Sequence, residues 1–212
     1  MSAWDALARL LSAEAAMQAR WVVVDCETSG LDAARDRLLS IGAVAVRAAR
    51  IRAHEAYEAT VAQAVPSSRD NILVHGIGEA RQRSGRPEAE VLDEFARFAG
   101  EAPCAAFRAP FDRAVLSAAA RRAGIRLPRR WLDLAELLPV LFPARGTREA
   151  TLDAWLASFA IRHAARHDAL ADAYATAQLL LVALDEARRQ GFASVRQVLG
   201  GARAAPWAAA RA

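Results

Sequence analysis

The sequence predicts an α/β fold in which a mixed five-stranded sheet is flanked by helices. Two long strand-like segments come first as a hairpin, and from residue 87 onward short strand-like segments alternate with segments of helical periodicity. The 212 residues suit one compact domain, and neither an internal repeat nor a linker divides them. We therefore expect all five strands to belong to one sheet.

The first part of the chain is expected to supply a helical extension and three strands. Residues 1–20 carry apolar side chains at helical spacing, which predicts an amphipathic N-terminal helix outside the main domain. Residues 66–85 are polar apart from a small apolar island at 72–74, so we expect a long loop there. Runs of β-branched or alternating apolar residues predict strands at residues 21–24, 38–46 and 51–61, with a tight turn near residues 48–49.

The second part of the chain is expected to alternate helices with two short strands. Apolar periodicity, with glycine or a capping residue at the ends, predicts helices at residues 87–99, 111–123, 135–141, 151–160 and 168–190. Short apolar segments predict a strand at residues 103–107 and a fifth strand, or alternatively the beginning of a helix, at residues 131–134. We expect residues 21–190 to form the main domain and residues 191–212 to form a mobile tail.

The composition is basic, which suits a phosphate-rich partner. The formal net charge is +4, and arginine supplies all 28 basic side chains because the chain contains no lysine. A positive balance of this kind suits nucleic acid. Arginine in place of lysine, together with abundant alanine, is also what the coding bias of a GC-rich genome produces. Both interpretations of the charge stay open.

The chain has the composition expected of a cytoplasmic protein. No segment reaches the roughly 18 uninterrupted apolar residues of a membrane span. Residues 3–20 carry charged side chains where a signal peptide would be apolar. Two cysteines make neither a disulfide framework nor a zinc site. We therefore expect a cytoplasmic location and no association with a membrane.

The first candidate site lies where the strand expected at residues 21–24 ends. Asp25 and Glu27 follow three valines, and side chains two residues apart in a strand point to the same face. Such a pair of carboxylates repels itself unless a cation lies between them, and oxygen-only ligands suit magnesium or manganese. Gly30 would let the chain turn sharply and a substrate approach. The alternative is a strand that ends in an exposed polar turn.

Two further candidate acids lie early in expected helices. Pro110 suits a first helical turn and places Asp112 there, where an acid also offsets the helix dipole. Asp168 is a good N-cap, which leaves His167 just before the last helix and Asp172 one turn inside it. A histidine in that position is a natural group to take a proton from water. A surface histidine and a solvated helix acid are the alternative.

These three blocks, in this order, resemble the motifs of the DEDDh 3′→5′ exonucleases, among them the proofreading epsilon subunit of bacterial DNA polymerase III. Residues 74–77, Val-His-Gly-Ile, also resemble the His-x-Ile loop of that family. The resemblance spans about residues 21–181 and implies a ribonuclease H-like fold. The matching positions are 25–30 for the motif Asp-x-Glu-Thr-x-Gly, Phe111, Asp112 and Leu116 for the second motif, and His167 and Asp172 for the third.

The resemblance implies a metal-dependent hydrolase that releases 5′-mononucleotides from a 3′ end. It implies two Mg²⁺ or Mn²⁺ ions per site, with His167 as the general base. The implied metal ligands are Asp25, Glu27, Asp112 and Asp172. The candidate substrate contacts are Thr28 near the terminal 3′-OH, Leu31 and His75 near the terminal base, and Arg108 near a phosphate.

One departure from the family pattern affects the second motif. Phe107 and Arg108 stand where that motif often has His and Asn. Because the expected ligand Asp112 is kept, the chemistry should survive, while the positioning of substrate near the scissile phosphate could differ. For Arg108, a solvated arginine is as good an interpretation as a phosphate contact.

The expected substrate is the single-stranded 3′ end of DNA, but two alternatives stay open. A ribonuclease or oligoribonuclease on the same scaffold fits the motifs equally well, because the distinction rests on contacts to the 2′-OH. A catalytically silent nucleic-acid-binding module is the second, although five intact site residues argue against it. Association with a polymerase is compatible with the sequence, yet residues 190–212 contain no convincing clamp- or polymerase-binding peptide.

Overall fold

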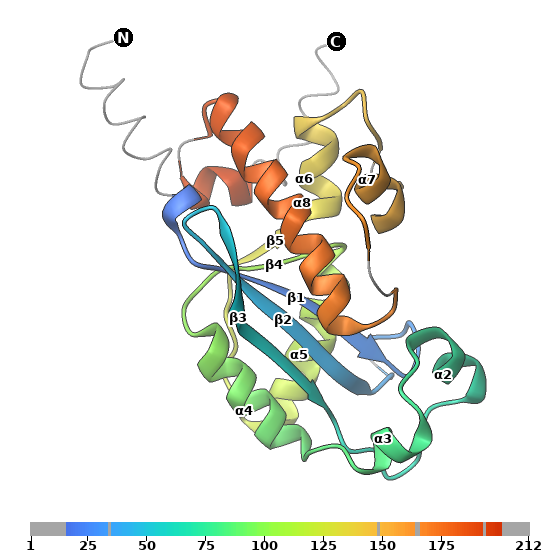
Figure 1. The fold of residues 1–212 in the computed structure, drawn as a ribbon. Coiled ribbons are helices and arrows are strands. Elements are labelled where there is room, and N and C mark those ends of the chain that lie inside the picture. The colour runs from blue at the N-terminus through green and yellow to red at the C-terminus, as the bar shows by residue number, and fades with distance from the viewer. Residues whose placement is uncertain (1–15, 34, 148, 164–165, 193, 201–212) are drawn as a thin grey trace.

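A five-stranded sheet in the order β3-β2-β1-β4-β5 forms the centre of the molecule (Figure 1). This computed structural model describes residues 16–33, 35–147, 149–163, 166–192 and 194–200. The antiparallel strands are β1 (Trp21–Thr28), β2 (Leu38–Arg47) and β3 (Arg50–Thr60), and the strands parallel to β1 are β4 (Cys104–Ala106) and β5 (Trp131–Asp133). The predicted mixed five-stranded sheet is confirmed.

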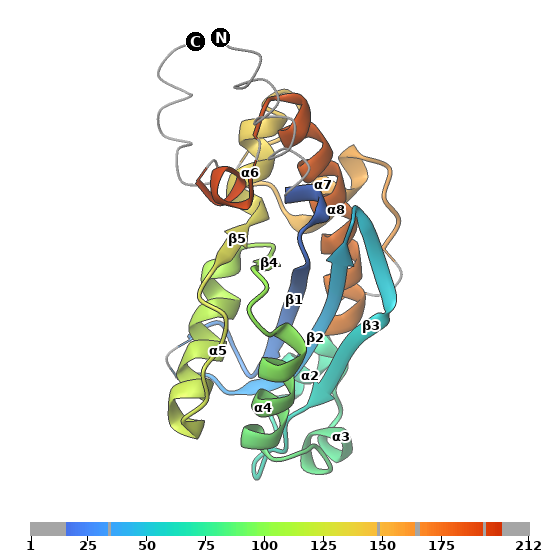
Figure 2. The same cartoon turned by 90° about the vertical axis from the view of Figure 1, so that its left-hand side faces the viewer.

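Helices cover both faces of the sheet (Figure 2). Because side chains alternate along a strand, β1 contributes to two separate cores. Val22 and Val24 pack with side chains of the helices on one face, whereas Trp21 and Val23 pack with those on the other. The first face carries α4 (Glu88–Ala99) and α5 (Ala109–Ala123), and the second carries α6 (Leu134–Leu141), α7 (Leu152–Ser158) and α8 (Ala169–Arg189).

The expected polar loop at residues 66–85 is wrong, because two short helices form there. These are α2 (Arg69–His75) and α3 (Glu79–Arg83). The Ser68 hydroxyl accepts the backbone N–H of Asn71 and caps α2, and Gly76 ends it with φ of 69°. The apolar island 72–74 lies inside α2. A helix of seven residues is too short to show helical periodicity in its sequence. The capping residues Ser68 and Gly76 are therefore better indicators of this helix than the polar composition of the segment.

The first strand is longer than the sequence suggested, and this changes where the acidic pair lies. β1 continues through Thr28, so Asp25 and Glu27 are inside the strand and not in a turn after it. The hairpin between β2 and β3 forms as expected, with Ala48 at φ 50° and Ala49 at φ 53°. Two positive φ values match the right-handed twist of the flanking strands.

The two ends of the chain are described only in part. Residues 16–18 are helical and Ala16 is buried, but most of the expected N-terminal helix, residues 1–15, lies outside the described residues. Within the expected mobile tail of residues 191–212, residues 195–200 are helical and Val198 is fully buried. Residues 193 and 201–212 lie outside the described part, so the division into extension, domain and tail stays a prediction.

Helix α8 crosses β2 at unusually close range, and a glycine makes this possible. Gly42 of β2 pairs with Asp25 of β1. A Cβ added at Gly42 would lie 2.2 Å from the backbone carbon of Ala169 and from the backbone nitrogen of Leu170. A real Cβ does not approach backbone that closely. The missing side chain therefore lets the N-terminus of α8 rest on the sheet beside Asp25.

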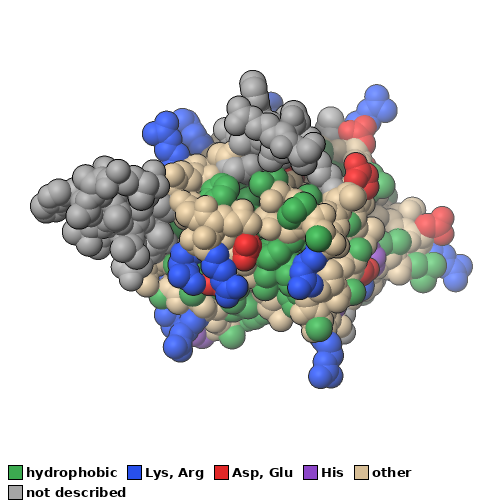
Figure 3. Space-filling model, turned by 90° about the horizontal axis from the view of Figure 1, so that it is seen from above, with side chains coloured by type: hydrophobic (Ala, Val, Ile, Leu, Met, Phe, Trp, Pro, Cys, Tyr) green, Lys and Arg blue, Asp and Glu red, His purple; other side chains and the backbone are tan. Residues whose placement is uncertain are grey.

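The arginines are spread over the surface. Seen from above in Figure 3, arginine side chains project at several places, with apolar side chains between them. The net charge of +4 is thus not gathered into one stripe on this face. Among the described residues, no helix is both long enough and apolar enough to cross a membrane.

Candidate active site

Asp25 and Glu27 lie on the face of β1 that α8 covers. They follow Val23 by two and four positions, and Val23 packs in the core shared with α8, so alternation directs all three side chains the same way. Cys26 between them belongs to the core on the opposite face. The strand therefore presents two carboxylates side by side next to the first turns of α8.

Asp112 is fastened to the same strand by a hydrogen bond. It lies in the first turn of α5, and its Oδ1 accepts the backbone N–H of Cys26 at 2.9 Å. Its side chain is buried, with 5% of the residue exposed. Pro110 occupies the beginning of this helix, as the sequence suggested. Asp112 thus joins the strand at the residue between Asp25 and Glu27.

Asp172 is the fourth acid, and three groups contact its carboxylate. Oδ1 lies 2.8 Å from Nη1 of Arg166 and 2.9 Å from Nε2 of His163, while Oδ2 accepts the backbone N–H of His167 at 3.0 Å. Asp168 caps α8 by accepting the N–H of Ala171, as predicted. Asp172 therefore lies one turn into the helix and is buried, with 4% of the residue exposed.

His167 lies at the rim of the cluster, as expected from its place before the cap. Its residue is exposed and its φ is 60°, a left-handed conformation held by the hydrogen bond from its N–H to Asp172. One ligand atom each from Glu27, His167 and Asp172 lie within 4.8 Å of one another. A pocket of about 300 Å³ contains this group; its lining includes Asp25, Glu27, Arg108, Arg166, His167 and Asp172.

The environment of the acids disfavours their charged forms. Burial, followed by the nearby carboxylates Asp172 and Asp112, raises the pKa of Glu27 to about 8. Burial also raises the pKa of Asp112 to about 7 and holds the pKa of Asp25 well above its usual range. The Arg166 guanidinium opposes the rise in the pKa of both Asp25 and Glu27. Without a further cation the acids therefore favour their protonated, uncharged forms, because Arg166 alone does not offset burial and mutual repulsion.

This donor set fits a divalent metal ion. Carboxylate oxygens are the ligands that Mg²⁺ and Mn²⁺ prefer, and a cation between like charges removes their repulsion. The Arg166 guanidinium already stands as a cation against Asp172. Asp25, Glu27, Asp112 and Asp172 are therefore brought together as the sequence predicted, with His167 beside them.

Three of the four residues expected to contact the substrate lie outside the pocket of the acids. The Thr28 hydroxyl donates to the carbonyl of Gly30 at 2.6 Å and is buried, whereas Leu31 is 92% exposed. The ring of His75 is used inside the fold: its Nδ1 accepts the N–H of Ile77, and its Nε2 lies 2.8 Å from the Asn71 side chain. None of the three lines the pocket of the acids. Their contacts with a nucleotide stay predictions.

Arg108 does line that pocket, and Phe107 lies beside it. Arg108 precedes α5 with φ of 62°, and its backbone N–H donates to the Asp133 carboxylate at 3.0 Å. Its guanidinium lies 3.4 Å from the carbonyl of Glu149, a long hydrogen bond that one of its five N–H groups donates. The guanidinium faces the pocket of the acids, and its contact with a phosphate stays a prediction.

Two residues of the site were missed by sequence reasoning. His163 has a side chain that is 9% exposed, and neither ring nitrogen has an aligned hydrogen-bond partner in the described part of the chain. Its 2.9 Å contact with Asp172 falls outside hydrogen-bond geometry. Arg166 immediately precedes His167 and bridges Asp172 to Asp153 of α7. The signal available was their spacing, four residues and one residue before His167.

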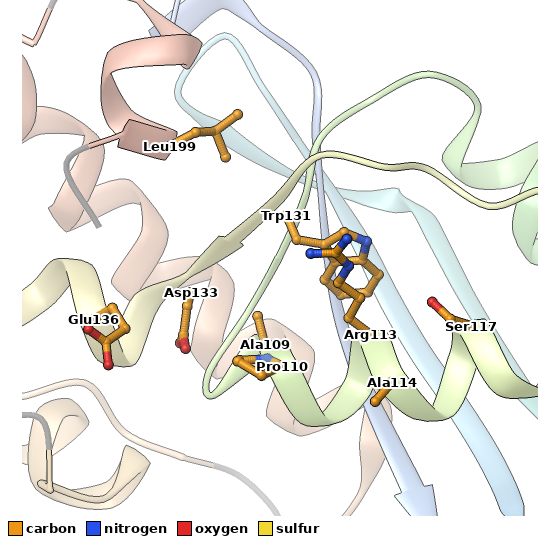
Figure 4. A pocket seen from close by; sticks show the side chains of 9 residues that line it. All are labelled: Ala109, Pro110, Arg113, Ala114, Ser117, Trp131, Asp133, Glu136 and Leu199. Carbon is orange, nitrogen blue, oxygen red and sulfur yellow. The ribbon is translucent and has the colours of Figure 1, made fainter. Parts of the chain in front are cut away.

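A larger hollow of about 440 Å³ lies elsewhere, between α5, β5, α6 and the segment containing Leu199 (Figure 4). Its side chains include Pro110, Arg113 and Trp131, with Asp133 and Glu136 at one end. None of the four clustered acids lines it. Although this hollow is the larger of the two, the clustered acids Asp25, Glu27 and Asp172 line the smaller pocket.

Comparison with known proteins agrees with this geometry. Residues 22–180 match the exonuclease family RNase_T. A DNA polymerase III PolC-type protein of Caldanaerobacter subterraneus subsp. tengcongensis is 29% identical over 185 residues, which is 87% of this chain and 13% of that protein. A DNA polymerase III subunit epsilon-like protein of Rhodobacter capsulatus is 34% identical over 125 residues, 58% of this chain and 18% of that protein. The chain thus spans a small part of these relatives.

Solved structures confirm the fold. Exonuclease I of E. coli, in complex with a dT13 oligonucleotide, has a TM-score of 0.68 at 19% identity, covering 82% of this chain and 42% of that one. Exonuclease X, in complex with 5′ overhanging duplex DNA, has a TM-score of 0.66 at 22% identity, covering 86% and 99%. The expected ribonuclease H-like architecture is confirmed. With three quarters of its length matched, from β1 into α8, this chain belongs to the exonuclease (RNase_T) family.

Proposed function

We propose that the chain is a metal-dependent 3′→5′ exonuclease that removes 5′-mononucleotides from the 3′ end of single-stranded DNA. The observation that carries the proposal is the convergence of Asp25, Glu27, Asp112 and Asp172 with His167 from three separate elements. Membership of the exonuclease family supports the reaction class. Intact acids at all four positions favour an enzyme over a silent binding module.

The four carboxylates would hold two Mg²⁺ or Mn²⁺ ions, which when bound supply an activated water and neutralise charge on the phosphate. His167 is exposed at the rim, so its ring can take the proton of the attacking water and pass it to solvent. The φ of 60° and the hydrogen bond from its N–H to Asp172 hold the backbone of His167 beside the acids. Arg108 and Arg166, both lining the pocket, can bind phosphate oxygens.

The choice of DNA rests on the relatives. Two of the similar solved structures hold DNA, and the two similar sequences are named as a DNA polymerase III PolC-type protein and as a DNA polymerase III subunit epsilon-like protein. Contacts to sugar and phosphate carry no sequence information, so we expect little sequence preference. A stand-alone enzyme and a polymerase subunit are both compatible with a chain that spans 13% of its PolC-type relative.

Labelled strands test the reaction, its direction and its metal requirement together. With Mg²⁺ or Mn²⁺, a 5′-labelled single strand of DNA should shorten one nucleotide at a time, and a 3′-labelled strand should release its label at once as a mononucleotide. EDTA should stop both. Shortening from the 5′ end would contradict the polarity, and no hydrolysis of DNA or of a matched RNA strand would contradict the enzyme. Faster hydrolysis of the RNA strand would make the chain a ribonuclease.

A further inference from the structure

Within the described part of the chain, Arg166 is the one arginine that contacts any of the four clustered acids, and the acid it contacts is Asp172. Its Nη1 lies 2.8 Å from Oδ1 of Asp172, and its Nε lies 3.0 Å from the Asp153 carboxylate of α7. The side chain of Arg166 is 35% exposed and that of Asp172 is 5% exposed. Arg166 therefore reaches from the pocket rim into a buried carboxylate, while Asp153, 58% exposed, holds it from the solvent side.

The Asp172 carboxylate is already occupied on both oxygens. Arg166 and His163 contact Oδ1, and the backbone N–H of His167 donates to Oδ2. His163 approaches as a buried side chain, whereas Arg166 approaches from the pocket that also contains Asp25 and Glu27. A divalent ion bound between these acids would lie next to the guanidinium. Two cations at one carboxylate oxygen repel each other strongly in a buried site.

We propose that Arg166 is a resident counter-cation of the carboxylate cluster, which a divalent ion displaces and which then binds a phosphate of the substrate. In the metal-free protein it holds Asp172 in place and offsets part of the repulsion among the acids. Displacement breaks its contact with Asp172 but not with Asp153, so the guanidinium stays at the pocket rim. This inference rests on the proposed function, because it needs metal and phosphate in the same pocket.

Metal titration of three proteins tests the displacement. Mn²⁺ binding is measured by calorimetry for the wild type, for Arg166→Gln and for the matched control Arg162→Gln. Arg162 is an exposed arginine of the same loop that lines a different hollow. Losing one charge-assisted hydrogen bond that competes with metal should make Arg166→Gln bind Mn²⁺ about tenfold more tightly. The control should stay within about twofold, because exposed charges at longer range are screened.

Thermal unfolding and kinetics supply independent readouts. In EDTA, Arg166→Gln should melt below both the wild type and Arg162→Gln, and added Mn²⁺ should raise its melting temperature by more than it raises theirs. At saturating Mn²⁺ its KM for a single-stranded oligonucleotide should rise about tenfold, and Arg166→Lys should recover part of this loss because it keeps a phosphate-binding charge. Arg166→Lys also serves if Arg166→Gln does not fold without metal.

The outcomes separate this inference from the function beneath it. If the wild type binds Mn²⁺ and neither Arg166 variant binds more tightly than Arg162→Gln, the guanidinium does not compete with metal and the inference is wrong, while the exonuclease proposal stands. Weaker Mn²⁺ binding by Arg166→Gln would mean that Arg166 supports the bound metal, which also overturns displacement. If the wild type itself binds no divalent ion, the proposed metal-dependent function is wrong, and the displacement of Arg166 by metal is wrong with it.

Discussion

Acidic side chains are treated in opposite ways in two regions of this molecule. Around α4 and β3 the acids have arginine partners: Glu94 is held by both terminal nitrogens of Arg86, each at 2.6 Å. That partner holds the pKa of Glu94 below its usual range. In the pocket at β1, burial and neighbouring acids raise the pKa of Glu27 to about 8. Further pairs in the first region are Glu58 with Arg81, Glu88 with Arg122, and Asp93 with Arg97.

The difference shows what each group of charges does. In a surface ion pair each charge is balanced by its partner and by water, so the pair contributes little to stability or to chemistry. Four clustered acids, of which only Asp172 contacts an arginine within the described part of the chain, are costly to the folded protein unless a cation is supplied from outside. The chain is rich in arginine and pairs many of its surface acids with arginines, yet within its described part only Arg166 contacts the clustered acids. Perturbed groups of this kind mark functional sites.

The largest expected effect comes from removing an acid of the cluster. Asp25→Ala should lower the hydrolysis rate by about 10³-fold or more, because several kcal/mol of charge stabilisation are lost at about 1.4 kcal/mol per tenfold. In EDTA the variant should melt no lower than the wild type, since a repelling carboxylate has gone. Asp93→Ala, which removes a surface acid of α4, should keep full activity. Near-normal turnover of Asp25→Ala would sink the metal assignment.

His167→Ala should reduce turnover by about 10²- to 10⁴-fold, the usual contribution of a general base. Mn²⁺ binding and binding of single-stranded DNA should persist, because the four acids remain. His54→Ala, a matched change at an exposed histidine of β3, should have no effect on the rate. Steady-state rates and Mn²⁺ calorimetry on both variants decide the matter. Full turnover in His167→Ala would show that another group accepts the proton.

The two regions should give the metal-free protein opposite responses to pH. The pKa of Glu27 rises from 4.5 to about 8 on folding, so its uncharged form stabilises the fold below that range, and this stability is lost as pH rises through about 8. The pKa of Glu94 is lowered, so its contribution is lost as pH falls. In EDTA the melting temperature should fall by about 5 °C or more between about pH 5 and pH 8, because the folded state keeps a proton that the unfolded state has lost in this range.

Matched variants identify the source of that fall. Glu27→Gln should flatten this decline, while Glu94→Gln should leave it unchanged. Saturating Mg²⁺ or Mn²⁺ should abolish the decline in the wild type, because a metal-bound carboxylate no longer gains from its proton. A decline that is the same in Glu27→Gln as in the wild type would place its origin outside this carboxylate.

The smallest effect should follow from breaking a surface pair. Arg86→Ala removes the partner of Glu94, yet both side chains of this pair reach solvent, so charge screening limits the loss. We expect a melting temperature within about 3 °C of the wild type and an unchanged hydrolysis rate. A large loss of stability would mean that the ion pairs of α4 and β3 act as a network. The surface acids would then matter for stability more than this comparison with the acid cluster assumes.

Sequence patterns predicted the sheet and the four acids because each carries its own local signal. The run of valines before Asp25 indicates a buried strand, and Asp168 as a cap fixes the place of Asp172 in α8. The hairpin turn at Ala48 was found from its flanking strands. These features depend on residues within a few positions of one another, so one sequence suffices to find them.

The missed features depend on tertiary contacts. His163 lies in a loop with no periodic pattern, and only the fold shows its ring against Asp172. In the sequence Arg166 is one of 28 arginines, and only the structure shows that its guanidinium lies between Asp153 and Asp172. The contact of Asp112 with the backbone of Cys26 joins residues 86 positions apart, and no local rule predicts it.

A side chain at Gly42 would change the geometry of the acid cluster, although Gly42 is not itself one of the acids. Any side chain there would force the N-terminus of α8 away from the sheet, because its Cβ would lie 2.2 Å from the helix backbone. Asp172, one turn further on, would move away from Asp25 on the paired strand. Shifts of about 1 Å in a reacting centre can cost about 100-fold in rate. A homologue could therefore keep every acid and the histidine, carry alanine at this position, and still be inactive, so a complete motif does not by itself identify a working enzyme.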